Sequence, residues 1–388
     1  MRFPRPAVKF DVRTTFAPGA CLLAALVIPL AATVPIAFAN EADTGSASSI
    51  QPPRPPVSLD LSSTTATMVL PTSLQSSLNI NVAGAAQAIN PGQLVTPAQL
   101  VAVYQVMNTG AQNIIIGQNG AATGGSMTIG AWGQNLSSLA VPQGVTVINT
   151  LQSLNLSGNL NNAGNIYAVT NNSAFNTANI AALNIINQPG ALISTMLPAT
   201  GLPGITNAVQ NLNLNLSAIQ SIINSGTIAS SGNLSMTAGL ISNTLPQGIT
   251  GPSPVMQALN NINLSAANIV NSGLIAATVG NINIASQLSA QLSQTINNTG
   301  GILQALNGTI NISATNLLQS DSVRMTGGDW LSRELNVDAG YGQLFANISN
   351  VTGIFNVKAG FAELFASAPN LTLGEICING DPTFANTI

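Results

Sequence analysis

Charged side chains are absent from a long central stretch of the chain. No Asp, Glu, Lys, Arg or His occurs from Leu61 to Ser320. Only 5% of the 388 residues are charged, against about 25% in an ordinary soluble domain. Because 46% of the residues are hydrophobic, the chain can still bury a core. Its polar surface must then consist of Asn, Ser, Thr, Gln and Gly, and this composition narrows the choice of fold.

A short pattern recurs within and beyond this uncharged stretch. Apolar residues occupy alternate positions, as in a β-strand, and Asn-x-Gly turns bound these segments. Asn and Gly tolerate positive φ angles, which suits them to such turns. Near the C-terminus, residues 335–346 match residues 355–366 at an offset of 20 residues. The turns are Asn162-Ala163-Gly164, Asn224-Ser225-Gly226, Asn271-Ser272-Gly273 and Asn298-Thr299-Gly300.

Stacked coils of a parallel β-helix account for both the repeat and the missing charge. In-register stacking places like residues above one another, and Asn above Asn forms an amide ladder along the turn line. A charge would face a like charge about 4.8 Å away, which is destabilising. We expect residues 197–204 and 245–252 to bulge out as loops between coils. An antiparallel sandwich joined by hairpins is the alternative fold.

Residues 1–75 indicate export followed by a tether. Residues 1–39 have the features of a secretory signal peptide: a basic start, an apolar run over residues 21–36, and the cleavage site Ala37-Phe38-Ala39. Residues 40–75 are predicted to be a Ser/Pro-rich linker. Cleavage would leave Cys377 as the single cysteine, which we expect to be a buried apolar residue in or near the core.

Residues 76–140 differ from the repeats and are predicted to form an N-terminal cap related to secretion. A solenoid needs such a cap to cover its end. One short helix is expected here, with Thr96 as N-cap, Pro97 in its first turn and Met107 near its end. Residues 141–388 are predicted to be the solenoid repeats. The chain ends within the repeat pattern, so we expect the repeats to continue in a longer protein.

The few charged side chains suggest no chemistry of their own. Removal of residues 1–39 leaves four basic and ten acidic side chains, which argues against nucleic acid as a partner. We predict no catalytic, cofactor-binding or metal-binding residue, and no enzyme. The offset of 20 residues places Lys358 above Asp338 as an exposed ion pair, whereas Glu334 and Asp338 do not correspond. The charged residues of the C-terminal part are Asp321, Arg324, Asp329, Arg333, Glu334, Asp338, Lys358, Glu363, Glu375 and Asp381.

The organisation resembles the filamentous haemagglutinin-like family of large bacterial surface proteins. The similarity rests on Asn-Ser-Gly-x-Ile and Gly-Asn-hydrophobic-x-hydrophobic units at 224–236 and 271–284, and on residues 335–366. It implies an all-β fold, a right-handed parallel β-helix with the small N-terminal cap. It also implies secretion, often through an outer-membrane pore. The family's Asn-Pro-Asn secretion motif is matched here only by Asn90-Pro91-Gly92, so other modes of surface attachment stay open.

Together these features predict an exported structural protein or adhesin at the surface of a Gram-negative bacterium. The expected partner is a glycan or protein on a host or neighbouring cell. The alternative is an exported polysaccharide-active enzyme on a β-helix scaffold, which would need two suitably placed carboxylates.

Overall fold

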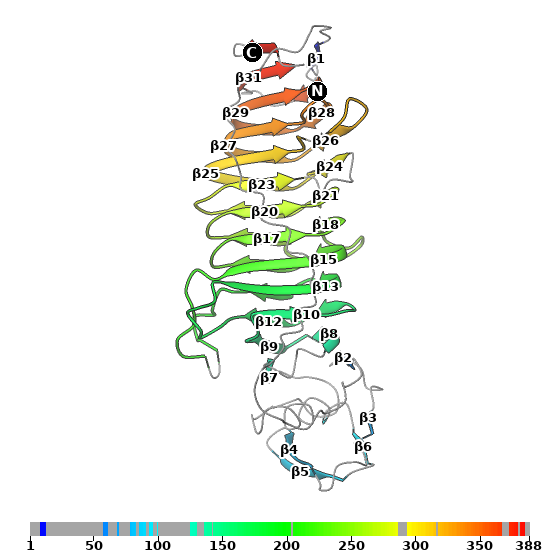
Figure 1. Cartoon of the computed structure of the whole chain (residues 1–388), viewed down its shortest axis with the longest axis vertical. Helices are drawn as coiled ribbons and strands as arrows, with labels where there is room; N and C mark the ends of the chain where they lie inside the picture. The colour runs from blue at the N-terminus through cyan, green and yellow to red at the C-terminus, as the bar shows by residue number, and fades with distance from the viewer. Residues whose placement is uncertain are drawn as a thin grey trace, which may run out of the picture.

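The computed structural model describes the greater part of the chain from residue 125 onward. Its continuous stretches are residues 143–202, 205–285, 293–315, 317–366 and 372–378. Shorter described segments are residues 8–12, 57–60, 68–69, 78–82, 85–90, 93–95, 99, 125–129, 136–141 and 381–384. In Figure 1 the strands of residues 125–378 pile up along the long axis of the molecule as successive coils of one stack.

The stack has three faces, each a ladder of parallel strands. Along the chain, face 1 is followed by face 2 and then by face 3. Face 1 begins with β2 (Val57–Asp60) against β8 (Leu136–Val141). Its further strands are β11 (Leu160–Asn162), the second halves of β13 (Thr177–Asn187) and β15 (Asn213–Asn224), β18 (Leu240–Asn243), β21 (Asn268–Asn271), β24 (Gln294–Asn297), β26 (Ser322–Thr326), β28 (Gln343–Ile348) and β30 (Phe361–Ala366).

Face 2 contains ten of the described strands, and each pairs in parallel with the next. Because neighbouring strands lie about 4.8 Å apart, this ladder is about 43 Å long. Its strands are β7 (Gly125–Ile129), β9 (Val145–Asn149), β12 (Asn165–Ala168), β14 (Leu192–Ser194), β16 (Thr227–Ser230), β19 (Val255–Ala258), β22 (Leu274–Ala277) and the first halves of β25 (Ile302–Ser313), β27 (Asp329–Asp338) and β29 (Asn350–Ala359).

Face 3 completes each coil with strands that are also parallel. They are β10 (Ser153–Asn155), the first halves of β13 and β15, β17 (Leu234–Thr237), β20 (Ile262–Ser265), β23 (Ile282–Ala285), the second halves of β25, β27 and β29, and β31 (Thr372–Ile378). The predicted parallel β-helix is confirmed, and the antiparallel sandwich is wrong.

The interior is filled by the alternate apolar residues of all three faces. Ile262 and Leu264 of β20 lie directly below Ile282 and Ile284 of β23, and all four are at most 1% exposed. Identical or similar side chains thus fill the core, because each residue packs against its own equivalent in the next coil. The predicted 20-residue offset is confirmed on face 3, where residues 335–338 pair with residues 355–358. It is wrong on face 1, where residues 343–346 pair with residues 361–364 at an offset of 18, because the turn that leads into β30 is two residues shorter, between paired positions, than the turn that leads into β28.

Both predicted insertions leave the stack as loops. Residues 195–212 connect β14 to β15, and residues 244–254 connect β18 to β19. The first loop folds back: Leu202 and Ile205 pack on the outer side of face 2, where they form a second apolar cluster with Ile148 and Tyr167. The outer surface of the early coils is therefore partly covered by the protein's own insertion.

An antiparallel hairpin of β4 (Leu78–Val82) and β5 (Ala85–Ile89) adjoins the end of the stack at which β7 lies. Ile89 is fully buried and belongs to the same core cluster as Ile129 of β7. β3 (Met68–Val69) pairs with β6 (Leu94–Val95). The parallel ladder already includes β7 and β8 of the region expected to be the cap, and β2 of the expected linker. Of the expected helix, Gln99 is helical, and the other positions lie outside the described residues.

Two antiparallel strands lie at the C-terminal end. β1 (Val8–Val12), from the expected export signal, runs along β30, and β32 (Asp381–Phe384) runs along β31. Cys377 of β31 is fully buried, as expected, and it is disulfide-bonded in the uncleaved chain. The single-cysteine expectation concerns the chain after cleavage at Ala39, and both the cleavage and that expectation stay predictions. No helix in the described part could cross a membrane.

Candidate functional site

A row of six asparagines, which we call the buried row, lines the corner where face 1 turns into face 2. Each side chain is at most 1% exposed. The Nδ2 atom of each of the first five asparagines donates a hydrogen bond to the Oδ1 atom of the next one, over distances of 2.7 to 2.8 Å. The predicted amide ladder is thus confirmed. Its members are Asn162, Asn187, Asn224, Asn243, Asn271 and Asn298.

Each amide in the buried row satisfies its remaining hydrogen-bonding groups through the backbone. Asn224 is representative: its Nδ2 also donates to the carbonyl oxygens of Gly226 (3.1 Å) and Val255 (3.0 Å), and its Oδ1 accepts from the Gly226 N–H. A buried polar group without a partner costs about 1–3 kcal/mol. The row therefore fixes the register of successive coils, because a shifted coil would leave several of these groups unpaired.

Sequence motifs reveal four of the six positions in the buried row. Asn162, Asn224, Asn271 and Asn298 all begin an Asn-x-Gly turn. Asn187 and Asn243 were missed because the chain after them does not follow this motif. Asn187 is followed by Gln-Pro-Gly, and Asn243 stands where the loop of residues 244–254 leaves the stack.

The buried row ends at Asn298 because glycine occupies the same corner in the next coil. Gly327 and Gly328 both have positive φ, at 65° and 70°. A Cβ atom on Gly328 would lie 2.0 Å from the backbone oxygen of Asn298 and 2.3 Å from its Nδ2. The glycine backbone thus closes over the last amide of the row. Trp330, two residues after Gly328, is fully buried, and its Nε1 donates to the Gly327 carbonyl oxygen at 2.9 Å.

A second row, which we call the surface row, runs along the outside of face 3 and is half-buried. Here too neighbours bond in register, for example Asn311 to Asn283 (2.9 Å) and Asn356 to Asn336 (2.7 Å). Every side chain in this row is neutral, and each can both donate to and accept from its own kind. Its members are Asn179, Asn215, Ser235, Asn263, Asn283, Asn311, Asn336 and Asn356.

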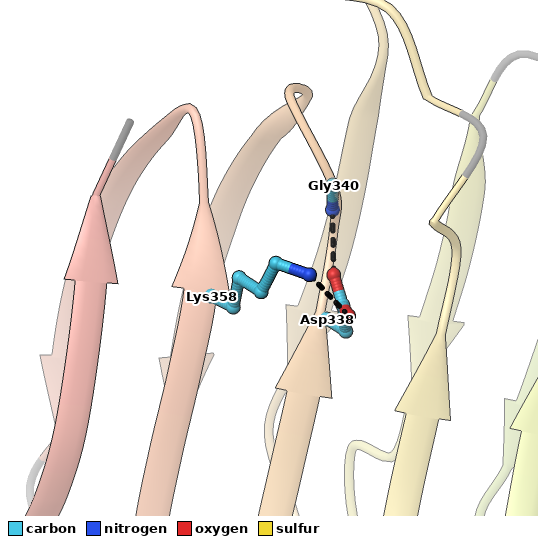
Figure 2. A network of polar contacts seen from close by, with 3 residues as sticks. All are labelled: Asp338, Gly340 and Lys358. Atoms are coloured by element: carbon cyan, nitrogen blue, oxygen red, sulfur yellow. Dashed lines mark hydrogen bonds and ion pairs between the residues drawn. The ribbon is translucent and has the colours of Figure 1, made fainter. Parts of the chain in front are cut away.

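The predicted ion pair between Asp338 and Lys358 is confirmed. Figure 2 shows the Lys358 ammonium of one coil reaching the Asp338 carboxylate of the neighbouring coil. The Nζ to Oδ2 distance is 3.1 Å, and Oδ1 accepts from the Gly340 N–H at 2.9 Å. The two side chains are 27% to 33% exposed. Such a solvated pair contributes little stability, but it shows how charge enters a stack: opposite signs occupy equivalent positions.

The two carboxylates considered for glycoside hydrolysis are not brought together. Glu334 and Asp338 both point outward from β27, four positions apart, which corresponds to about 13 Å along a strand. Carboxyl pairs in glycosidases are about 5–9.5 Å apart. Within the described residues no three His, Cys, Asp or Glu side chains gather to hold a metal ion.

The other charged residues are distributed over different parts of the last coils. Asp321 is nearly buried and accepts from the Leu318 N–H at 3.0 Å. Arg333 is exposed, and Asp329 is half-buried on face 2. Glu375 and Asp381 lie in β31 and β32, at the C-terminal end of the stack.

One constellation was missed by sequence reasoning and lies on the outside of face 1. The Arg324 guanidinium stands over the Phe345 ring, 4.5 Å from its centroid, and the Phe361 ring is tilted against Phe345 at 6.0 Å. Arg324, Phe345 and Glu363 occupy equivalent positions of β26, β28 and β30. The offsets between them differ from 20 residues, so the sequence repeat gives no sign of this column.

The fold and its asparagine rows place the chain in the class of parallel β-solenoids. Comparisons with protein-family models, with curated proteins and with solved structures find no match to this chain.

Proposed function

We propose that this chain is an exported surface protein whose solenoid acts as a stiff shaft for attachment, as a structural element or an adhesin. The observation that carries the proposal is the continuity of the stack. The face 2 ladder runs through ten of the described strands for about 43 Å without a break in its parallel pairing. Beside it, the buried row joins six successive coils from Asn162 to Asn298.

A shaft of this kind suits surface presentation for a physical reason. Each coil contacts its neighbours only, so the fold lengthens in one direction and offers long outer faces. Up to residue 320 those faces carry no charge, and the surface row on face 3 presents amide and hydroxyl groups at regular spacing. The signal-peptide features of residues 1–39 support export, and the resemblance to filamentous haemagglutinin-like proteins supports a place at the outer membrane of a Gram-negative cell.

Secretion through a partner outer-membrane pore is part of the same proposal. In this scheme the N-terminal region, with its β4–β5 hairpin, engages the secretion pathway, and the solenoid repeats form outside the cell. The expected binding partner is a glycan or protein of a host or neighbouring cell.

The experiment is surface detection in the native organism. An antibody raised against the solenoid should label intact cells, and added protease should remove that label without lysis. Deletion of residues 205–366 should abolish attachment of the cells to a surface or to partner cells. A matched deletion strain that expresses a cytoplasmic reporter controls for leakage.

Two outcomes would contradict the proposal. One is a signal found only after the cells have been opened. The other is full attachment by cells that lack the solenoid residues.

A further inference from the structure

The outer surface of face 1 changes character in the last coils. In earlier coils its outward positions are occupied by neutral residues such as Asn184, Ser221, Asn268 and Thr295. From β26 onward they include a cation and aromatic rings. We call the outward side chains of β26, β28 and the start of β30 the aromatic panel: Arg324, Thr326, Gln343, Phe345, Asn347 and Phe361.

Arg324 is held in place, and no counter-charge contacts it among the residues that the structure describes. Its guanidinium is exposed, and its contact within the described residues is the Phe345 ring at 4.5 Å. A cation over a ring face is attracted by the ring quadrupole, which restricts its motion. The N–H groups at the edge of the planar guanidinium then face solvent, where they can donate two parallel hydrogen bonds to one carboxylate.

Neighbouring groups supply the other contacts that a sugar needs. Asn347 is exposed, and its side-chain amide has no hydrogen bond within the described part of the chain. Phe345 and Phe361 are half-buried, so parts of their rings remain available to the apolar face of a sugar. Strands lie about 4.8 Å apart and successive outward residues about 6.6 Å apart. The panel therefore measures about 10 Å across its three strands and about 13 Å along β28, enough for about two sugar rings.

We propose that the aromatic panel binds an acidic oligosaccharide, with Arg324 pairing to a sugar carboxylate and Asn347 to a neighbouring hydroxyl group. This inference rests on the proposed surface function and names its ligand class. Charge complementarity selects the ligand, because Arg324 is the charged member of the aromatic panel and is exposed. Residues 61–320 contain no charged side chain, so the other charges that act on the panel are those of the last coils.

Glu363 lies in the same column as Arg324, two strand steps away, with Phe345 between them. That separation is about 9.6 Å, close to the Debye length at physiological salt. Glu363 therefore weakens the attraction for an anion without cancelling it. Its removal should strengthen binding, which gives the proposal a variant with the opposite sign.

The test measures binding of the purified full chain to oligogalacturonate immobilised on beads, beside the methyl ester of the same oligosaccharide. The acid should bind more tightly than the ester, and the difference should shrink as salt is raised. Arg324→Gln should weaken binding of the acid about ten- to a hundredfold, as expected for loss of a charge-assisted bidentate pair. Glu363→Gln should strengthen it severalfold.

Arg333→Gln is the matched control, because Arg333 is also an exposed arginine but lies outside the aromatic panel. It should leave binding unchanged. If Arg324→Gln fails to fold, Arg324→Lys keeps the charge and loses the fork, and it should still weaken binding severalfold. Urea unfolding of each variant monitors the fold.

Equal binding of acid and ester, no binding of either, or equal losses in Arg324→Gln and Arg333→Gln would overturn the inference. So would capture of a protein ligand by the panel without any sugar. These results leave the proposed function intact, since surface labelling and attachment are measured on cells. Conversely, the proposed function alone would be contradicted if the purified protein binds the acid but is never found on the surface of cells.

Discussion

The coils up to Asn298 and the coils from Gly328 onward have the same three-faced architecture. They differ in which residue types lie above one another at equivalent positions. In the earlier segment, the corner holds an asparagine over an asparagine, and the outer faces are neutral. In the later segment, glycine closes the corner, and outward positions carry charge. Along the parallel coils there, two charges lie next to residues of another kind: Asp338 below Lys358, and Arg324 below Phe345.

The difference shows that a residue can repeat at one position of the stack only if it interacts favourably with its own kind. An amide both donates and accepts, so it can repeat above itself without limit. A carboxylate or an ammonium cannot, because like charges directly opposite repel. A stack that repeats one residue at one position must therefore be neutral there, and a stack that carries charge must alternate its residues.

The largest expected effect comes from placing one charge in the buried row. Asn224→Asp would bury a carboxylate beside the Asn243 Oδ1 and the Val255 carbonyl oxygen, both of which are acceptors. We expect a loss of about 3–5 kcal/mol in the free energy of unfolding at pH 7, as for an uncompensated buried charge. Urea denaturation followed by circular dichroism measures it.

The same exchange in the surface row is the control for that variant. Asn336→Asp should cost about 1 kcal/mol, because the side chain is half-exposed and Asn356 still donates to it. Equal losses in the two variants would break the distinction between the buried row and the surface row.

The glycine that ends the buried row should be nearly as sensitive. Gly328→Ala forces a Cβ atom into the backbone of Asn298 at a positive φ, so we expect a loss of about 2–4 kcal/mol. Gly248 has a similar φ of 81°, but a Cβ there would meet nothing within 4 Å. Gly248→Ala should cost only about 1 kcal/mol. Thermal unfolding of the pair separates steric overlap from backbone strain, and a larger loss at Gly248 would refute this account of the row's end.

A smaller effect is expected for the stacked ion pair. Asp338→Asn keeps an oxygen for the Gly340 N–H and removes only the attraction to Lys358. The expected loss is about 0.2–1 kcal/mol at low salt, and it should vanish near 1 M salt. Urea denaturation at both salt concentrations measures it. A loss that is independent of salt would mean that packing, and not charge, joins these coils.

The smallest effect concerns pH. Tyr167 is the titratable side chain of the neutral segment from residue 143 to residue 320, and burial raises its pKa above the ordinary value of 10.0. The unfolded chain therefore loses this proton first. The contribution of neutral Tyr167 to the free energy of unfolding is fully present below pH 10 and is lost as pH rises through the raised pKa. Stability of Tyr167→Phe should fall less steeply above pH 10, and identical curves would contradict the shift.

Much of the fold could be predicted because a repeating sequence repeats its physical environment. The alternate apolar positions, four members of the buried row and the register of Asp338 with Lys358 follow from residues that recur at fixed spacing. Asn187 and Asn243 could not be found this way, because the insertions that follow them alter the turn motif.

The chain's sequence by itself determined that equivalent positions must be neutral or alternate in charge, since that condition depends only on which residues recur. Only the tertiary structure decided which residues without a common spacing become neighbours. Arg324 meets Phe345, and Leu202 folds back onto Tyr167, because coil length and loop path are set by packing over the whole stack. Such contacts join positions whose separation in the chain carries no period, so no pattern in the sequence reports them.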